Sequence, residues 1–565
     1  MRKIYILIFI LFSTSLSSQD YISPFDFPLY LSGTFGELRD HHFHTGIDVK
    51  TNAVEGKNLR AIADGYISRI KVSTWGYGKV LYIVHPQTGH TSVYAHMKKF
   101  NEEIEKVTKE QQYKKESFEI NFYPKKNSLL VKQGDIIGLS GNSGGSGGPH
   151  LHFEIRETKT GNPLNPLAFG FKVLDDINPV LTEIKIYPHK NSSLNGDKKN
   201  LRIPLTKLQD GIYSINNVDL KVHGDISFGI STFDRQNGSP NNKNGVYSIK
   251  MFVNEKLIHH FEVDELIFSE KRFINAHIDF EEYTDNRIRF NRCYSLPYNR
   301  LSNYKVNINK GVLSFTDNKK HIIRFEVCDI ENNTSVVEFN VQSEEKSPKF
   351  DYKDSIDMFN YDEANTFGES DFKVHIPAYS FYDNYYYNFV VGDKTENTLS
   401  KEYHFMNKNI PLHKEIVVSI KDSIPEILKQ KSYIAIKKEN GSFKYKGKTW
   451  KNGSLHAKTR ELGVFTIIAD TINPIISEYN LKNHTNTNNV GNISVKILDN
   501  ESGISYYRGE IDGEWILMDY DFKSDLLVYY IEKDKLQIGE HTLKITVRDR
   551  MDNETVFIKN FSVNF

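Results

Sequence analysis

The run GGPHLHFEI at residues 147–155 constrains the fold more than any other stretch of the chain. Polar and apolar side chains alternate after the glycines, in the order His150, Leu151, His152, Phe153, Glu154 and Ile155. This period of two is typical of a half-buried β-strand, so the two histidines project from one face, roughly 6.6 Å apart along the strand. One imidazole can bind a metal ion at about 2.0–2.1 Å while the other stands over whatever the ion holds. A chance spacing of two surface histidines is the alternative.

A second group of metal-ligand residues lies earlier, in the run RDHHFHTGIDV at residues 39–49. His44 and Asp48 have ligand character, but in a straight strand residues four apart are separated by about 13 Å. A bulge or bend at Gly46 could bring the imidazole and the carboxylate together. We expect His41 and His42 to be solvated neighbours of the site, because four ligands from one short loop would close a zinc site.

Residues 59–96 have the pattern of a strand meander, with turn signals between apolar alternating runs. Tyr94 and His96 share a face by parity. His85 and His90 stand at turn edges, so we expect both on the surface. The charged residues 97–126 interrupt the meander, with helical spacing over 101–115. They are interpreted as an insertion over the sheet, either a solvated helical hairpin or a substrate gate.

Three paired motifs in this order resemble the lysostaphin/LytM-type zinc metallopeptidases, which cleave peptide stems or bridges of bacterial peptidoglycan. The motifs are His44-x-x-x-Asp48, Tyr94-x-His96 and His150-x-His152, and the resemblance covers about residues 30–170. It includes the glycines of GTFG at 33–36 and of GLSGNSG at 138–144, and the closing NPL at 165–167. The resemblance implies an antiparallel β-sheet peptidase domain.

The same resemblance implies a role for each motif residue. His44, Asp48 and His152 would be ligands of one Zn²⁺ ion, and His96 and His150 would be the catalytic histidines. Two imidazoles and one carboxylate leave a fourth tetrahedral position for water, as in a catalytic zinc site. Because no HExxH helix is present, His96 or His150 must take the proton or hold the oxyanion during hydrolysis by metal-activated water. Glu154 is expected to be structural or to support a ligand.

An internal repeat occupies the long C-terminal part, in which the sequence shows no ligand constellation beyond Phe171. DDINPVL at 175–181 matches DTINPII at 470–476, and each block closes with a strand, an aspartate (Asp329 or Asp549) and an asparagine (Asn333 or Asn553). Asp234 and Asp499 lie between these ends. Short alternating strands with polar turns predict β-sandwiches, and the blocks are similar to bacterial immunoglobulin-like modules.

These patterns predict a mainly β protein in several parts, consistent with a length of 565 residues. The expected order is a signal peptide (1–18), a peptidase domain (19–172, with an insertion at about 97–126), an immunoglobulin-like β-sandwich (173–343), a β-rich domain (344–469) and a second immunoglobulin-like β-sandwich (470–565). The tyrosines at 379–387 in the β-rich domain could stack on glycans, but core or edge packing is the favoured interpretation.

The first residues have the order of a secretory signal peptide: Arg2 and Lys3, a nine-residue apolar run, then small polar residues. Cleavage is expected near 17–19, without a lipoprotein cysteine, and no later run could span a membrane. The protein is therefore expected to be exported to the periplasm, cell envelope or exterior. Its formal net charge of zero gives no reason to expect nucleic acid. Cys293 and Cys328 could pair in an oxidising compartment.

Three functions compete at this point. The leading hypothesis is an exported zinc endopeptidase acting on peptidoglycan peptides. The alternatives are a non-enzymatic cell-wall-binding regulator of other hydrolases, and a scaffold or adhesin led by its β-modules. The β-modules could also bind a cell-envelope protein partner. The presence of all five histidine and aspartate positions favours the enzyme.

Overall fold

The computed structural model describes residues 20–216, 218–345, 358–480, 491–532 and 535–563. The expected signal peptide therefore lies outside the described residues. The chain is mainly β, which confirms the predicted fold class. Among the described residues, no helix combines the length and apolarity needed to cross a bilayer.

The N-terminal part is built on a nine-stranded antiparallel sheet in the order β1-β4-β13-β8-β7-β6-β10, with β11 beside β6 and β14 beside β13. Its strands are β1 (Leu31–Gly33), β4 (Ile47–Lys50), β6 (Gly65–Val72), β7 (Lys79–His85), β8 (His90–Met97), β10 (Ile120–Phe122), β11 (Leu130–Val131), β13 (His150–Glu157) and β14 (Pro163–Leu164). The alternating run at 150–155 is thus a central strand, and its apolar side chains are fully buried in the core.

Smaller elements surround this sheet. They are β2 (Leu38–Arg39) paired with β3 (His42–Phe43), the sheet β5-β12-β9 (Asn58–Arg60, Ile136–Leu139, Lys99–Phe100), α1 (Glu102–Lys115) and the 3-10 helix η1 (Pro166–Phe169). The helix expected at 101–115 is present, and the Asn101 side chain caps its first turn. The strand that follows, β10, adds an edge to the main sheet.

Residues 180–343 form a thirteen-stranded sheet in which β19 has strand neighbours along its whole length. The strands are β15 (Val180–Pro188), β16 (Ser193–Leu194), β17 (Leu201–Gln209), β18 (Ile212–Ile215), β19 (Lys221–Gln236), β20 (Ser239–Asn244), β21 (Ser248–Val253), β22 (Lys256–Glu262), β23 (Phe290–Arg292), β24 (Tyr304–Asn307), β25 (Leu313–Phe315), β26 (Lys320–Cys328) and β27 (Thr334–Ser343). Short helices lie between them: η2 (Phe268–Phe273), α2 (Ile274–His277), α3 (Phe280–Asn286) and η3 (Ile308–Gly311). Cys293 and Cys328 are both free thiols.

Two five-stranded sheets enclose one core in the next part. One contains β29 (Asn365–Glu369), β30 (Phe372–Ile376), β34 (Ile416–Lys421), β38 (Ser454–Thr459) and β37 (Thr449–Lys451). The other contains β32 (Phe389–Val391), β33 (Tyr403–Phe405), β39 (Gly463–Ala469), β35 (Ser432–Lys437) and β36 (Phe443–Gly447), with β28 (Met358–Phe359), β31 (Tyr385–Tyr386) and α4 (Glu426–Lys429) alongside. Tyr382 is fully buried and donates a hydrogen bond to the Arg272 carbonyl, which supports packing rather than glycan stacking for this tyrosine.

The C-terminal part, here called the C-terminal module (residues 470–563), is two four-stranded sheets around one core. The strands are β40 (Ile475–Glu478), β41 (Asn492–Leu498), β45 (Leu526–Tyr530) and β44 (Met518–Asp521) in one sheet, and β43 (Glu514–Ile516), β42 (Ile504–Ile511), β46 (Gly539–Asp549) and β47 (Glu554–Val563) in the other.

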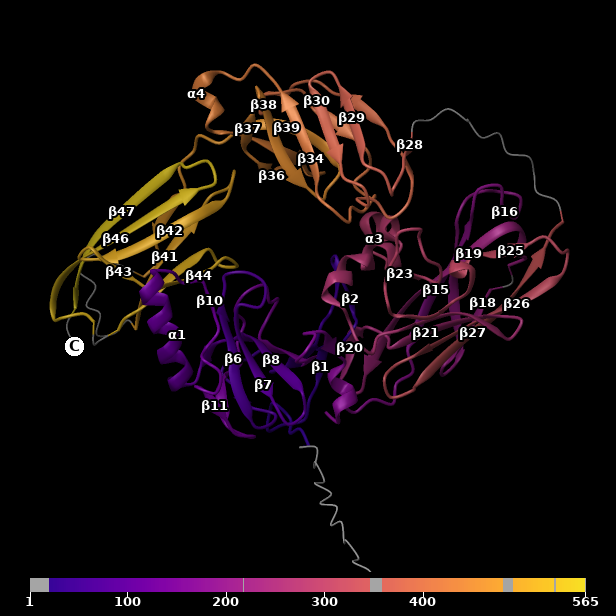
Figure 1. Cartoon of the computed structure of the whole chain (residues 1–565), viewed down its shortest axis with the longest axis horizontal. Coiled ribbons are helices and arrows are strands. Elements are labelled where there is room, and N and C mark those ends of the chain that lie inside the picture. Colours follow the sequence, from indigo (N-terminus) through magenta and orange to yellow (C-terminus); the bar gives the residue numbers. More distant parts are fainter. Residues whose placement is uncertain (1–19, 217, 346–357, 481–490, 533–534, 564–565) are drawn as a thin grey trace, which may run out of the picture.

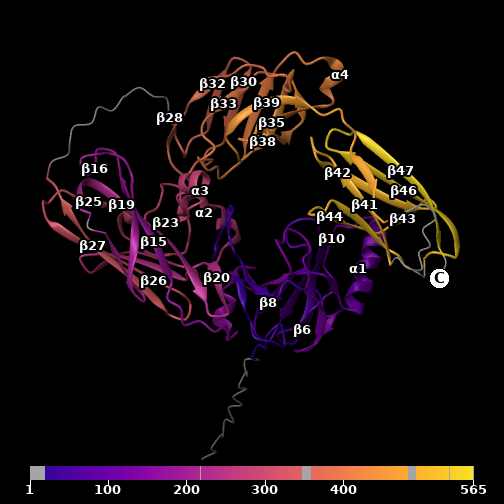
Figure 2. The same ribbon diagram turned by 180° about the vertical axis from the view of Figure 1, so that it is seen from behind.

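The four parts are arranged as a ring, and the C-terminal module returns to the N-terminal part (Figures 1 and 2). In both views α1 and β10 lie beside the C-terminal module. Lys109 on α1 forms an ion pair with Glu532 at 2.7 Å, and Tyr113 packs edge-on against Trp515. The helix therefore packs against this module and is not solvated on all sides, while the substrate-gate role stays a prediction.

Candidate active site

Three side chains from two separated segments converge at one point of the N-terminal sheet. The Nε2 atom of His44 lies 3.0 Å from Asp48 Oδ1 and 2.9 Å from His152 Nδ1. His152 Nδ1 lies 3.0 Å from the same Asp48 oxygen. All three side chains are buried. The structure thus brings together the His44, Asp48 and His152 predicted from the sequence.

The chain bends at Gly46, between β3 and β4, and this bend makes the His44–Asp48 contact possible. Asp48 then pairs with His152 across β4 and β13. A Cβ atom at position 46 would lie 2.3 Å from the carbonyl oxygen of Phe153, so only glycine allows the two strands to approach this closely. The bend expected at this glycine is present.

Each of the two imidazoles in the cluster has its other nitrogen fixed by an acceptor. His44 Nδ1 lies 2.8 Å from the Thr34 carbonyl, and His152 Nε2 lies 2.8 Å from Glu154 Oε1. When both rings are neutral, these two nitrogens therefore carry the protons. His44 Nε2 and His152 Nδ1 then present their lone pairs toward Asp48. Orientation of this kind is what a metal site requires of its histidines.

Glu154 is completely buried and connects the cluster to the sheet behind it. Beside its bond to His152, it accepts hydrogen bonds from Tyr77, from Thr45 at 2.7 Å and from Arg156 at 2.5 Å. Burial acts to raise the pKa of this carboxyl, but Arg156 and His152 together hold it below the usual range. Glu154 is therefore a supporting carboxylate, consistent with the role expected from its parity in the strand.

The charge on the cluster is set by its carboxylates. The neighbouring imidazoles, His44 first, hold the pKa of Asp48 well below its usual range despite burial. Burial acts to lower the pKa of His152, but the hydrogen bonds that its ring donates to Asp48 and Glu154 prevail and raise the pKa to about 9. A cation entering the cluster must therefore displace a proton from this imidazole.

His96 and His150 form a second pair beside the cluster, with ring centroids 4.9 Å apart. His96 Nδ1 donates to the Ser143 carbonyl at 2.8 Å, and His150 Nδ1 to the Gly148 carbonyl at 2.8 Å. Each ring thus keeps a free Nε2, and that of His150 lies 3.5 Å from Asp48 Oδ1. Burial, followed by the charges of His152 and His150, lowers the pKa of His96 to about 3.

An irregular stretch of backbone orients the His96 side chain toward the cluster. The register of β7 and β8 shifts beside it, and His96 has a φ of 58°, which is rare outside glycine. Strained backbone of this kind is concentrated at functional sites. The Ser143 hydroxyl accepts a bond from the Lys79 amide at 2.9 Å and donates one to the Met97 carbonyl at 2.8 Å, so the Gly-rich loop 138–148 is fixed against β7 and β8.

Other histidines lie away from these five residues. His41 and His42 are exposed, as expected. The expectation for His85 was wrong: its side chain is fully buried, with Nδ1 2.9 Å from the Asp64 carbonyl and Nε2 2.7 Å from the Ser92 hydroxyl. These two partners satisfy both ring nitrogens, which a turn-edge position in the sequence does not reveal.

Some supporting residues were not found from the sequence. Arg39 donates to Asp48 Oδ2 at 2.9 Å and pairs with Glu37 at 3.0 Å, which fixes the second carboxylate oxygen of Asp48. Tyr77 contacts Thr45 at 3.0 Å and Glu154. Neither residue has a spacing that relates it to the histidine motifs, so the sequence gives no sign of these contacts.

The expectation of no ligand constellation beyond Phe171 was also wrong. Aspartates come together at two further places, each with one carboxylate oxygen per residue within 4.8 Å of the others: Asp175, Asp234 and Asp329 in one, and Asp470, Asp499 and Asp549 in the other. Their members are up to 154 residues apart in the sequence (329 − 175), so only the fold shows the clusters.

The fold and the site together define a domain of the metallopeptidase class, with a His/Asp/His candidate metal site beside two further histidines. Residues 42–117 and 121–166 match the family described as Peptidase family M23, so the N-terminal part is an M23 peptidase domain, and the resemblance stated from the sequence is confirmed. Residues 356–470 match the family described as Zu5-like domain.

Curated relatives match the same N-terminal region. A DD-carboxypeptidase/endopeptidase, Mpg, of Neisseria meningitidis is 33% identical over 131 residues, 23% of this chain and 24% of the relative. The glycyl-glycine endopeptidase ALE-1 of Staphylococcus capitis is 32% identical over 175 residues, 31% of this chain and 39% of the relative. The chain thus spans about a quarter of the Neisseria protein's length. The solved catalytic domain of lysostaphin from Staphylococcus simulans is 26% identical, with a TM-score of 0.18, covering 25% of this chain and 88% of that domain.

Proposed function

We propose that the N-terminal domain is a zinc-dependent endopeptidase that hydrolyses peptide cross-links or stems of bacterial peptidoglycan. The observation that carries this proposal is the convergence of His44 Nε2, Asp48 Oδ1 and His152 Nδ1, each about 3 Å from the other two. The substrate class is supported by the curated relatives, whose names describe a DD-carboxypeptidase/endopeptidase and a glycyl-glycine endopeptidase.

The donor set fits zinc. Ligand atoms around a tetrahedral Zn²⁺ lie roughly 3.3 Å apart, given zinc–ligand distances of about 2.0–2.1 Å. The three atoms here are 2.9–3.0 Å apart, so a small outward movement would admit the ion. Two nitrogens and one carboxylate oxygen are also the ligand types that zinc accepts at a catalytic site. We therefore assign one Zn²⁺ to His44, Asp48 and His152.

Bound zinc would supply Lewis-acid polarisation of the scissile carbonyl and a lowered pKa for water. The chain's own catalytic groups are then His96 and His150. Each imidazole has Nδ1–H fixed on a backbone carbonyl and Nε2 free, so each can accept a proton at Nε2 or, once protonated, donate a hydrogen bond to a developing oxyanion. Burial and the charges of His152 and His150 lower the pKa of His96 to about 3, so this imidazole is neutral near neutral pH.

We further propose that the chain is exported to the periplasm, cell envelope or exterior, where peptidoglycan is accessible. The basic, apolar and small polar order of residues 1–18 supports this location. The domain boundaries at about 172, 343 and 469, and the immunoglobulin-like character of the two repeat blocks, belong to the same proposal.

Digestion of purified sacculi by the isolated protein tests the enzymatic proposal. We expect soluble muropeptides from the wild-type chain, loss of release with 1,10-phenanthroline, and recovery on adding zinc. His152→Ala should abolish zinc binding and release, whereas His42→Ala, a change at an exposed histidine outside the cluster, should leave both unchanged. Binding of sacculi without cleavage by the zinc-loaded protein would refute the proposal and favour a wall-binding regulator.

A further inference from the structure

The two aspartate clusters occupy equivalent positions in the two repeat blocks. Asp175 and Asp470 each stand three residues before an Asn-Pro pair, and Asp329 and Asp549 each stand four residues before an asparagine. Asn333 Nδ2 donates to Asp329 at 2.7 Å and to the Asp175 carbonyl at 3.1 Å.

Asn553 repeats this arrangement in the second block. Its Nδ2 donates to Asp549 at 2.6 Å and to the Asp470 carbonyl at 3.0 Å. Two aspartates and an asparagine are therefore joined in the same way in both blocks, with a third aspartate beside them in each. A chance encounter of acidic side chains does not explain this recurrence.

The first cluster contains buried oxygens that lack a protein partner. Within the described residues, Asp175 Oδ2, Asp234 Oδ1 and Gln236 Oε1 accept no hydrogen bond. Asp234 and Gln236 are each only 2% exposed, and Gln236 follows Asp234 by two residues on β19. Burying polar groups without hydrogen-bond partners costs free energy, so we expect this cluster to hold a ligand that oxygen atoms can bind.

The second cluster has the same property. Tyr433, fully buried on β35 of the preceding part, has a hydroxyl without a hydrogen-bond partner among the described residues, and so has buried Ser502. Tyr433 packs in one buried cluster with Met551, whose amide donates to Asp549 Oδ1 at 2.7 Å, which places this tyrosine beside the aspartates. The Ser502 amide donates to Asp470 Oδ2 at 3.1 Å, so its side chain also belongs to the cluster.

Neither cluster is neutralised by the protein. In the part of the chain that the structure describes, none of the six carboxylates has a lysine or arginine nitrogen within 4.0 Å. Three carboxylates in so small a space repel one another unless a cation lies between them.

We propose that each repeat block binds one Ca²⁺ ion, at Asp175/Asp234/Asp329 and at Asp470/Asp499/Asp549. Calcium fits because the donors are all oxygens, and Ca²⁺ takes six to eight oxygen ligands at about 2.3–2.6 Å with flexible geometry. The absence of histidine and cysteine from the two described clusters argues against zinc or copper. Gln236 at the first site and Tyr433 and Ser502 at the second supply additional oxygens.

Both sites stand where one part of the chain joins the next. In the β19–β20 hairpin Asp234 pairs with Asn244 and Gln236 with Ser239, and Gly245, just after the hairpin, donates to the Thr34 hydroxyl at 2.9 Å. The Thr34 carbonyl in turn holds His44. At the second site, Tyr433 belongs to the part that contains β35, and Asp470 begins the C-terminal module, so the two residues lie on opposite sides of the junction between these parts. Calcium would therefore fix the orientation of the β-modules, including the one that contacts the peptidase domain.

Calcium content of the full-length protein tests this proposal independently of peptidase activity. After treatment with EGTA and dialysis against millimolar calcium, we expect two calcium ions per chain by atomic emission. Asp234→Asn should lose one, Asp499→Asn the other, and the double variant both. Asp219→Asn, a change at an exposed aspartate in the first block, is the matched control and should keep two.

Terbium luminescence excited through tyrosine gives a second readout, because Tyr433 lies at the second site. Emission should fall in both Asp499→Asn and Tyr433→Phe and should be displaced by calcium. Fewer than two calcium ions on the wild-type chain, or two on the double variant, would overturn the proposal. If the variants do not fold, the wild-type thermal midpoint decides: a rise with calcium but not with magnesium supports the sites, and an unchanged midpoint refutes them.

Discussion

At the residue scale, the candidate zinc site depends on groups that hydrogen-bond its ligands without contacting the ion. His44 is oriented by the Thr34 carbonyl and His152 by Glu154, so each ring presents one chosen nitrogen. Asp48 is held on its other oxygen by Arg39. Such partners typically contribute 10–100-fold to metal affinity or activity, about as much as a weak ligand would.

Substitution of the buried carboxylate tests this support. Glu154→Gln retains the shape and an acceptor for His152 Nε2–H but removes the charge that makes the imidazole a better donor to metal. We expect about 10–100-fold weaker zinc binding and a similar fall in kcat/KM on a muropeptide. Competition with a fluorescent zinc chelator and steady-state kinetics would measure the two effects.

Glu157→Gln is the matched control on the same strand. Glu157 lies at the end of β13, where it accepts a hydrogen bond from the Thr160 hydroxyl and pairs across the sheet with His90, which is outside the cluster. Zinc affinity and kcat/KM should stay at the wild-type level in this variant. Equal behaviour of the two variants would show that Glu154 has no role in the metal site.

At the element scale, the site depends on how closely β4 and β13 approach each other. Asp48 and His152 are paired residues of these strands, and the chain enters β4 through the bend at Gly46. The Phe153 backbone and the Cγ atom of the buried Glu154 face this glycine, so the neighbours have little freedom to move. Stability and metal binding should therefore depend on the same residue.

Gly46→Ala tests this dependence. The added methyl group would be placed 2.3 Å from the Phe153 carbonyl oxygen, and relief of such overpacking typically costs about 1–3 kcal/mol. We expect a lower thermal midpoint and weaker zinc binding, measured by calorimetry and by zinc titration. Gly147→Ala, where the new methyl group meets nothing within 4 Å, should leave both unchanged. A Gly46→Ala protein as stable as this control would contradict the proposed packing.

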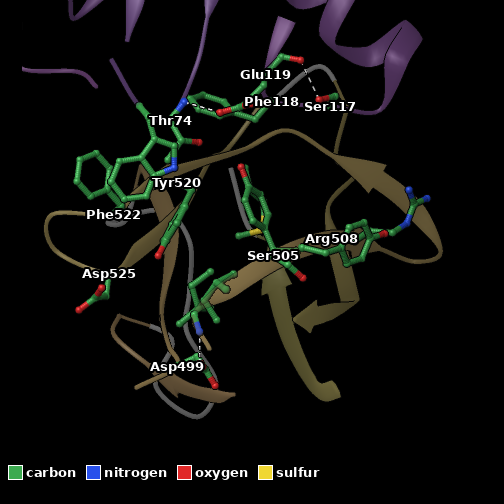
Figure 3. Close-up of a pocket in the computed structure, with 18 of the residues that line it drawn as sticks. Thr74, Ser117, Phe118, Glu119, Asp499, Ser505, Arg508, Tyr520, Phe522 and Asp525 are labelled. Atoms are coloured by element: carbon green, nitrogen blue, oxygen red, sulfur yellow. Dashed lines mark hydrogen bonds between the residues drawn. The ribbon is translucent and has the colours of Figure 1, made fainter. Parts of the chain in front are cut away.

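At the scale of the whole molecule, the C-terminal module contacts β7 and the Gly-rich loop 138–148, in which the Ser143 carbonyl accepts a hydrogen bond from His96. Lys523 donates to the Asn142 carbonyl in the Gly-rich loop, and Lys79 forms an ion pair with Asp519 at 2.9 Å. Trp75 packs on Phe522, with ring centroids 3.6 Å apart. Beside this contact, a cleft of about 570 Å³ lies between Thr74 and Glu119 of the peptidase domain and Tyr520 of the module (Figure 3).

Removal of the aromatic contact should open the ring. In the double variant Trp75→Ala and Phe522→Ala, we expect a larger radius of gyration by small-angle X-ray scattering, because interfaces between domains of one chain are small enough to separate. Ile558→Ala, a change at an exposed residue of the same module, should leave the radius unchanged. An unchanged radius in the double variant would show that other contacts close the ring.

Much of the peptidase domain could be predicted from the sequence because its evidence is local. Alternation in residues 150–155 identified a strand and placed His150 and His152 on one face, and Gly46 indicated the bend that joins His44 to Asp48. Tertiary structure alone decided three other matters: the burial of His85, the gathering of six aspartates into two clusters, and the return of the C-terminal module to the peptidase domain. The physical reason is the distance along the sequence over which each effect acts. Periodicity and turn chemistry act between neighbours in the chain, whereas these three features depend on packing between residues far apart in sequence, which no short pattern encodes.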